Sequence, residues 1–205
     1  MLRLPFCGVV LVTAFWSGLA AQATSPVAHR PARVPPAAEQ IVAAVLPLPG
    51  ELRDGATVLG YNADVKLVTL RAGNGDMICL ASDPTADRFH VACYHRAMEP
   101  FMARGRALRG RGVKGSAVDS VRFAEVQAGT LKMPTQPAAL YSLTGPAGSF
   151  DPATGAARGA RPLYVIYIPF ATAASTGIPA TPARGVPWIM FPGTPKAHIM
   201  FVPSM

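Results

Sequence analysis

Five side chains of metal-binding type lie close together in the sequence: Cys79, His90, Cys93, His95 and Met98. Thiolates, imidazoles and thioethers can bind zinc, copper or haem iron. Their spacing fits neither a zinc template with two pairs of ligands nor the Cys-x-x-Cys-His signature of attached haem. On an extended strand Cys93 and His95 share one face, whereas His90 lies on the other. We therefore predict no metal and no cofactor, and keep a metal or haem site near His95 or His198 as the alternative.

Hydrolysis is a second chemistry to consider, because it needs only a nucleophile, a base and an orienting acid. The available candidates are Ser116, Ser120, Asp119 and His198. No Gly-x-Ser-x-Gly elbow is present, and His198 follows a Pro-Gly turn in a predicted strand, where an ordinary sheet histidine is favoured. The catalytic residues therefore stay unassigned, and the candidate polar site consists of His90, His95 and His198. An extracytoplasmic hydrolase using His95 or His198 is the alternative function.

A basic stretch from Arg96 to Lys114 contains a single acidic residue, Glu99. Planar guanidinium groups bind phosphate and carboxylate, so we predict contacts with anionic envelope components such as lipid headgroups or glycans. A solvated basic face is the simpler interpretation. No aromatic platform is interleaved here, which together with export argues against nucleic acid. The candidate anion contacts are Arg104, Arg106, Arg109 and Arg111.

The segment 193–198, Gly-Thr-Pro-Lys-Ala-His, is another polar candidate, because loops on a strand scaffold often carry function. Its proline and glycine favour a plainer interpretation, a hairpin turn chosen for its backbone shape. We expect it to join strands at 188–191 and 198–202.

The N-terminus has the pattern of a secretory signal peptide at residues 1–23. Arg3 supplies the positive start, Leu4 to Trp16 the apolar run, and Ala21-Gln22-Ala23 the small residues before the cut. A spanning helix needs about 20 apolar residues, and neither this run nor any later one is long enough. We predict a chain that begins near Thr24, lies in the periplasm or outside the cell, has no transmembrane segment and has lost Cys7.

Composition bounds the fold. Removing 23 of the 205 residues leaves 182, which suits one domain, and 50% of the chain is hydrophobic. The 19 glycines and 21 prolines favour many turns and short strands. We predict a proline-rich flexible lead at 24–36. Residues 37–205 are predicted to form one α+β domain, rich in antiparallel strands, with a few short helices and one disulfide.

Three predicted strands bring together Cys79 and Cys93, the two cysteines that remain after loss of Cys7. Segments 65–71 and 76–81 flank Asn74-Gly75, a pair typical of a type I′ hairpin turn. A third strand at 89–95 folds back so that Cys93 comes close to Cys79. Directly opposed residues on antiparallel strands are within disulfide reach. An oxidising compartment favours their pairing.

The other elements follow from apolar spacing and from the positions of proline and glycine. Helices are expected at 37–46, where Ile41, Val45 and Leu48 would be buried, at 97–112 and at 116–129. Further strands are expected at 139–143 and 163–168, and a single helical turn at 171–175.

Short motifs occur in a fixed order along the chain: Ala56-Thr57-Val58-Leu59, Gly73-Asn74-Gly75, Cys79-Leu80, Cys93-Tyr94 and Pro192-Gly193-Thr194-Pro195. In these motifs the chain resembles an uncharacterised family of bacterial exported proteins with no established activity. Asp76 stands where that family has an aromatic residue, and His198 where it has an aliphatic one. The resemblance implies an exported domain and transfers no catalytic residue. We therefore predict an exported envelope or secreted protein, non-enzymatic and either structural or ligand-binding.

Overall fold

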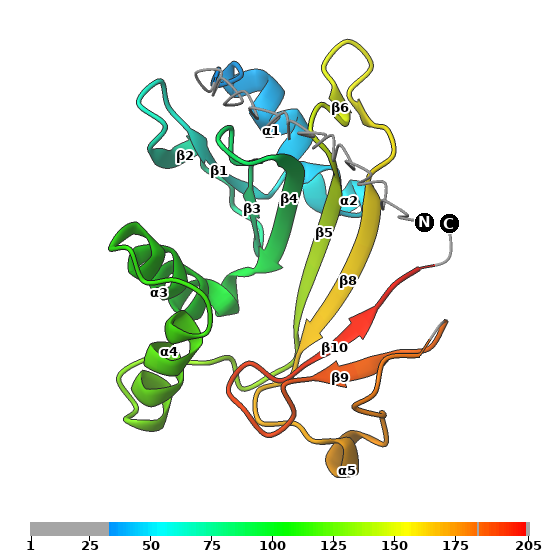
Figure 1. Cartoon of the computed structure of the whole chain (residues 1–205). Helices are drawn as coiled ribbons and strands as arrows, with labels where there is room; N and C mark the ends of the chain where they lie inside the picture. The colour runs from blue at the N-terminus through cyan, green and yellow to red at the C-terminus, as the bar shows by residue number, and fades with distance from the viewer. Residues whose placement is uncertain (1–32, 184, 204–205) are drawn as a thin grey trace, which may run out of the picture. The chain divides into compact units, whose positions relative to one another are not determined.

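The computed structural model describes residues 33–183 and 185–203, so the predicted signal peptide, its cleavage before Thr24, Cys7 and most of the proline-rich lead lie outside the described residues. The core of the fold is an eight-stranded sheet (Figure 1). Its strand order is β2 (Leu67–Arg71), β1 (Thr57–Tyr61), β3 (Met77–Leu80), β4 (Arg88–His95), β5 (Ala138–Pro146), β8 (Arg161–Tyr167), β10 (His198–Phe201) and β9 (Trp188–Met190). Neighbouring strands are antiparallel except β1 and β3, which are parallel. The predicted α+β fold is confirmed.

Five short α-helices, a 3-10 turn at Arg96–Met98 and a small ribbon complete the described part of the chain. The helices are α1 (Ala37–Val45), α2 (Gly50–Arg53), α3 (Glu99–Gly110), α4 (Ala117–Gln127) and α5 (Ala173–Thr176). The ribbon pairs β6 (Phe150–Asp151) with β7 (Ala156–Ala157). Helices α1, α3, α4 and α5 and strands β5, β8, β9 and β10 lie where the sequence predicts them. Helix α2, strand β1 and the ribbon were not expected.

The predicted hairpin between 65–71 and 76–81 is wrong. Strand β1 lies between the two segments: it pairs with β2 antiparallel, Tyr61 opposite Leu67, and with β3 parallel, Val58 opposite Cys79. Neither Asn74 nor Gly75 has a positive φ, so the type I′ turn that the dipeptide favours does not form. Instead the connection packs against Gly55, whose carbonyl accepts a 2.8 Å hydrogen bond from the Gly75 amide.

The disulfide joins Cys79 of β3 to Cys93 of β4, which are directly opposed in the register, with Cα atoms 3.9 Å apart. This confirms the predicted pairing. Both cysteines are fully buried beneath α1, in a core that includes Ala44, Val45 and Leu48. The disulfide therefore lies at the centre of the layer between α1 and the sheet.

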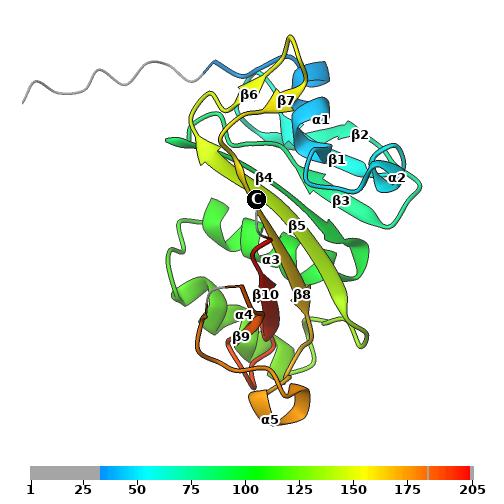
Figure 2. The ribbon, with the colours of Figure 1, turned by 90° about the vertical axis from the view of Figure 1, so that its right-hand side faces the viewer.

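Helices α3 and α4 cover the opposite face of the sheet (Figure 2). Ile78 and Tyr94 alternate with the cysteines along β3 and β4 and therefore point to this second face. There they pack with Met98 and Phe101, both fully buried. No helix in the described ranges is long and apolar enough to cross a membrane.

Candidate functional site

Two clefts flank one turn of the chain, the segment 82–87 between β3 and β4. The parallel strands β1 and β3 both end beside this turn, because Leu59 lies opposite Leu80 and the Ala81 amide donates to the Leu59 carbonyl. Both clefts therefore lie beyond the carboxyl ends of β1 and β3, the one parallel pair among the described strands of this sheet.

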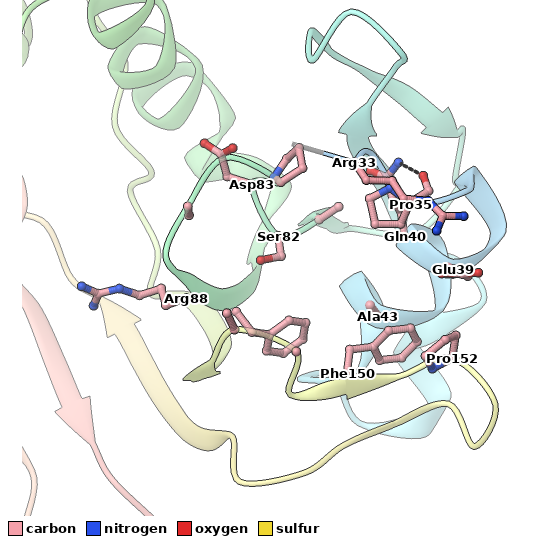
Figure 3. A pocket seen from close by; sticks show the side chains of 16 residues that line it. Arg33, Pro35, Glu39, Gln40, Ala43, Ser82, Asp83, Arg88, Phe150 and Pro152 are labelled. Atoms are coloured by element: carbon pink, nitrogen blue, oxygen red, sulfur yellow. Dashed lines mark hydrogen bonds between the residues drawn. The ribbon is translucent and has the colours of Figure 1, made fainter. Parts of the chain in front are cut away.

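The first, which we call the α1-side cleft, has a volume of about 290 Å³ (Figure 3). Its floor is apolar and contains Ala43 of α1 with Phe89 and Phe150. The two phenyl rings are stacked, with centroids 6.4 Å apart and planes 9° apart. Charged side chains at the rim come from both walls: Arg33, Glu39, Asp83 and Arg88. The cleft therefore combines an aromatic floor with a polar edge.

Gln40 fixes the wall of the α1-side cleft. Its buried amide donates to the carbonyls of Pro35 at 2.8 Å and Tyr61 at 2.9 Å, and its oxygen accepts from the Tyr61 amide at 2.8 Å. These bonds tie α1 to the end of β1. Gly60 makes room for them, because a Cβ there would lie 2.7 Å from the Gln40 side-chain oxygen.

The second, the α3-side cleft, has a volume of about 480 Å³ and is lined by Tyr61, Asp83, His90 and Thr144 among others. His90 and Thr144 are opposed on β4 and β5, and the His90 Nδ1 lies 2.8 Å from the Thr144 hydroxyl. Partial burial and the Arg88 guanidinium lower the pKa of His90, while burial and the Asp83 carboxylate raise that of Tyr61. Both pKa shifts favour the uncharged form of the side chain, the neutral imidazole of His90 and the neutral phenol of Tyr61.

The three predicted histidines do not meet. His90 lines the α3-side cleft, whereas His95 caps the following turn by accepting from the Ala97 amide at 3.2 Å. His198 is buried on β10, where its Nδ1 donates to the Lys196 carbonyl at 2.6 Å and its ring contacts Tyr167. Among the residues that the structure describes, no group of three or more His, Cys, Asp and Glu side chains is placed to hold a metal ion.

The residues considered for a hydrolase do not lie together either. Asp119 binds Lys196 at 2.9 Å and Arg122, and not His198. The exposed Ser120 hydroxyl donates to the Ser116 carbonyl one helical turn away. The described residues therefore hold no Ser-His-Asp arrangement around His198.

Of the four arginines predicted to contact anions, two form ion pairs within the protein and two are exposed. Arg104 binds Glu125, with its Nε 2.8 Å from a carboxylate oxygen, and Arg106 donates to Glu99 at 2.6 Å. Arg109 and Arg111 are exposed at the end of α3. Only the second pair leaves its guanidinium groups open to an external anion.

Sequence reasoning found His90 but missed the other residues of the two clefts. Gln40, Phe150 and Thr144 carry no local signal, because each lines a cleft only through long-range packing. Asp83 lies in a turn, and turn residues give no indication in the sequence of the cavities beside them. Comparison with known proteins adds no assignment, since no protein-family model, curated protein or solved structure matches this chain.

Proposed function

We propose that the protein is exported and acts outside the cytoplasm as a non-catalytic binding protein, with its ligand in the α1-side cleft. The observation that carries the proposal is the cleft itself, where stacked Phe89 and Phe150 form an apolar floor beneath charged side chains. A concave, mostly apolar surface with a few polar groups is the usual form of a small-ligand site.

Export is supported by the leader pattern and by the buried Cys79–Cys93 disulfide, since such bonds persist in oxidising compartments. The test is expression of the full chain in a bacterial host, followed by cell fractionation and N-terminal sequencing. A processed chain that begins at Thr24 and leaves the cytoplasm is the expected result. Unprocessed protein retained in the cytoplasm with free thiols would contradict it.

Ligand binding is tested on residues 24–205 with a panel of small anionic, cationic, sugar and aromatic fragments, followed by amide chemical shifts. We expect at least one fragment to shift amides around Ala43, Ser82 and Phe150. Phe150→Ala should reduce those shifts. Phe201→Ala is the matched control, because Phe201 is exposed on β10, far from the cleft in the sheet order.

Anionic envelope components are proposed as further partners, now through Arg109 and Arg111 rather than all four arginines. Binding to vesicles containing anionic lipid should weaken as salt rises, because exposed charges are screened within about 10 Å at 0.1 M. Arg109→Gln with Arg111→Gln should reduce this binding more than Arg104→Gln, whose guanidinium is held by Glu125.

Hydrolysis is the second candidate, because the Thr144 hydroxyl and the His90 imidazole have the separation of a nucleophile and its base. The third member is missing: Asp83 accepts from the amide and hydroxyl of Thr85 instead of orienting His90. Esterase and peptidase screens of the natural chain and of His90→Gln distinguish the two functions. Turnover that disappears in the variant would favour the enzyme.

A further inference from the structure

We propose that the ligand of the α1-side cleft is an uncharged aromatic side chain carried by an extended peptide segment. The inference rests on the proposed ligand-binding function and names the class of ligand.

The cleft is electrically balanced although the chain as a whole carries a formal charge of +8. Its lining holds two arginines, Arg33 and Arg88, and two acids, Glu39 and Asp83. None of them is paired across the cleft with another residue of the described chain; the one ion pair is between Arg88 and its neighbour Asp87, at 3.5 Å. An anion or a cation entering the cleft therefore meets a like charge as well as an opposite one. This arrangement favours a neutral group.

The size of the cleft suits one ring. An apolar cavity of about 150 Å³ binds one benzene molecule, so the 290 Å³ of the cleft leaves room for one ring and the start of the chain that carries it. The parallel rings of Phe89 and Phe150 offer an aromatic surface on which a third ring can pack face to face or edge to face. A single aromatic side chain fits this space.

The mouth of the cleft suits a peptide main chain. Exposed residues border it on both sides, including Arg33 before α1 and Asp83 of the turn, so a bound chain can continue into solvent in either direction. Ser82 lies between the two walls (Figure 3). Its hydroxyl oxygen accepts from the His90 amide at 3.0 Å, which leaves its hydrogen for an acceptor such as a peptide carbonyl.

The experiment compares three probes that share one ring and differ in charge. N-acetyl-phenylalanine amide is neutral, N-acetyl-phenylalanine is an anion and phenylalanine amide is a cation. We expect the neutral probe to bind most tightly, with an affinity that is unchanged between low and high salt. Phe150→Ala should weaken it by about tenfold, the loss expected when about half the burial of a ring is removed.

Two further variants keep the result interpretable. Phe150→Leu preserves an apolar floor and should retain most of the affinity, which separates loss of the ring from loss of folding. Ser82→Ala should weaken the neutral probe about threefold to tenfold, the range for a single hydrogen bond. An unchanged affinity in Ser82→Ala would remove the peptide carbonyl from the proposal.

The outcomes separate this inference from the proposed function. Tightest binding of the anionic probe, weakened by salt, would overturn it, because the overall charge of the protein would then dominate. Shifts at the cleft with other fragments but with none of the three probes would reject the ligand class and leave ligand binding intact. If no fragment shifts any amide of the cleft, both the aromatic ligand and the proposed ligand-binding function are rejected.

Discussion

Lys196 and Asp119, 77 residues apart in the sequence, form an ion pair with a nitrogen–oxygen distance of 2.9 Å that ties the turn before β10 to helix α4. Asp119 also binds Arg122, whose side chain is almost fully buried and lies 3.8 Å above the Phe101 ring. One carboxylate therefore holds the turn and neutralises a buried cation.

Asp119→Ala should cost about 2 kcal/mol of unfolding free energy, because it removes the carboxylate that accepts a charged hydrogen bond from the buried Arg122. Lys196→Ala should cost less, about 0.5 kcal/mol, since its own ammonium is better exposed. Urea denaturation of both variants measures the difference. Asp87→Ala is the control, because its pair with Arg88 is exposed and should not change the midpoint. Equal losses in the Asp119 and Lys196 variants would show that Arg122 does not need the carboxylate.

His198 should make the protein less stable in mild acid. Burial lowers the pKa of His198, so the folded chain resists a proton that the unfolded chain accepts near its ordinary value of about 6.5. The contribution of His198 to the unfolding free energy is therefore fully present above about pH 6.5, and it is lost as the pH falls below that value. His198→Gln should flatten the dependence of unfolding free energy on pH between about 7 and 5. A variant with the same slope as the natural chain would contradict this.

Replacing Cys79 and Cys93 together by alanine should lower the unfolding free energy by about 3 kcal/mol, the value for a short closed loop in the chain-entropy model. The cysteines lie 14 positions apart and are fully buried in the folded state. Reductant should therefore cleave the natural disulfide only as fast as the protein unfolds. Rapid reduction of the folded protein, followed by thiol labelling and mass spectrometry, would contradict the burial.

Two glycines of α3 should respond oppositely to alanine. A Cβ at Gly105 would lie 2.9 Å from a terminal nitrogen of the buried Arg122, whereas nothing lies within 4 Å of one at Gly110. Gly105→Ala should therefore destabilise the protein by about 1–3 kcal/mol. Gly110→Ala should stabilise it by up to about 1 kcal/mol, through helix propensity. Thermal unfolding of the pair checks the sign in each case.

The fold was largely predictable because most of its helices and strands have local sequence signals. Prolines and glycines bound α1, α3 and β8, and the short turn between the strands of Cys79 and Cys93 favours their pairing side by side. The error at Asn74-Gly75 has a physical origin, since a turn preference is outweighed when a third strand supplies better backbone pairing. Strand β1 was missed as a separate element because it includes Gly60, a residue that weakens the strand pattern.

The candidate site was much less predictable than the fold. Gln40, Ser82 and Phe150 lie on three separate segments and meet only through tertiary packing. His90 was singled out for its chemistry, but its partner Thr144 is 54 residues away on the next strand of the sheet. The histidines share no cavity because β4 places His90 and His95 on opposite faces, a separation that the strand period does predict.

The turn at 82–87 is the common wall of two cavities on opposite faces of one sheet. Ser82, Asp83 and Ala86 line both cavities, so an occupant that moves the turn changes a wall of the other cavity. Two occupants that each shift the turn are therefore thermodynamically linked, and each must change the affinity of the other by the same factor.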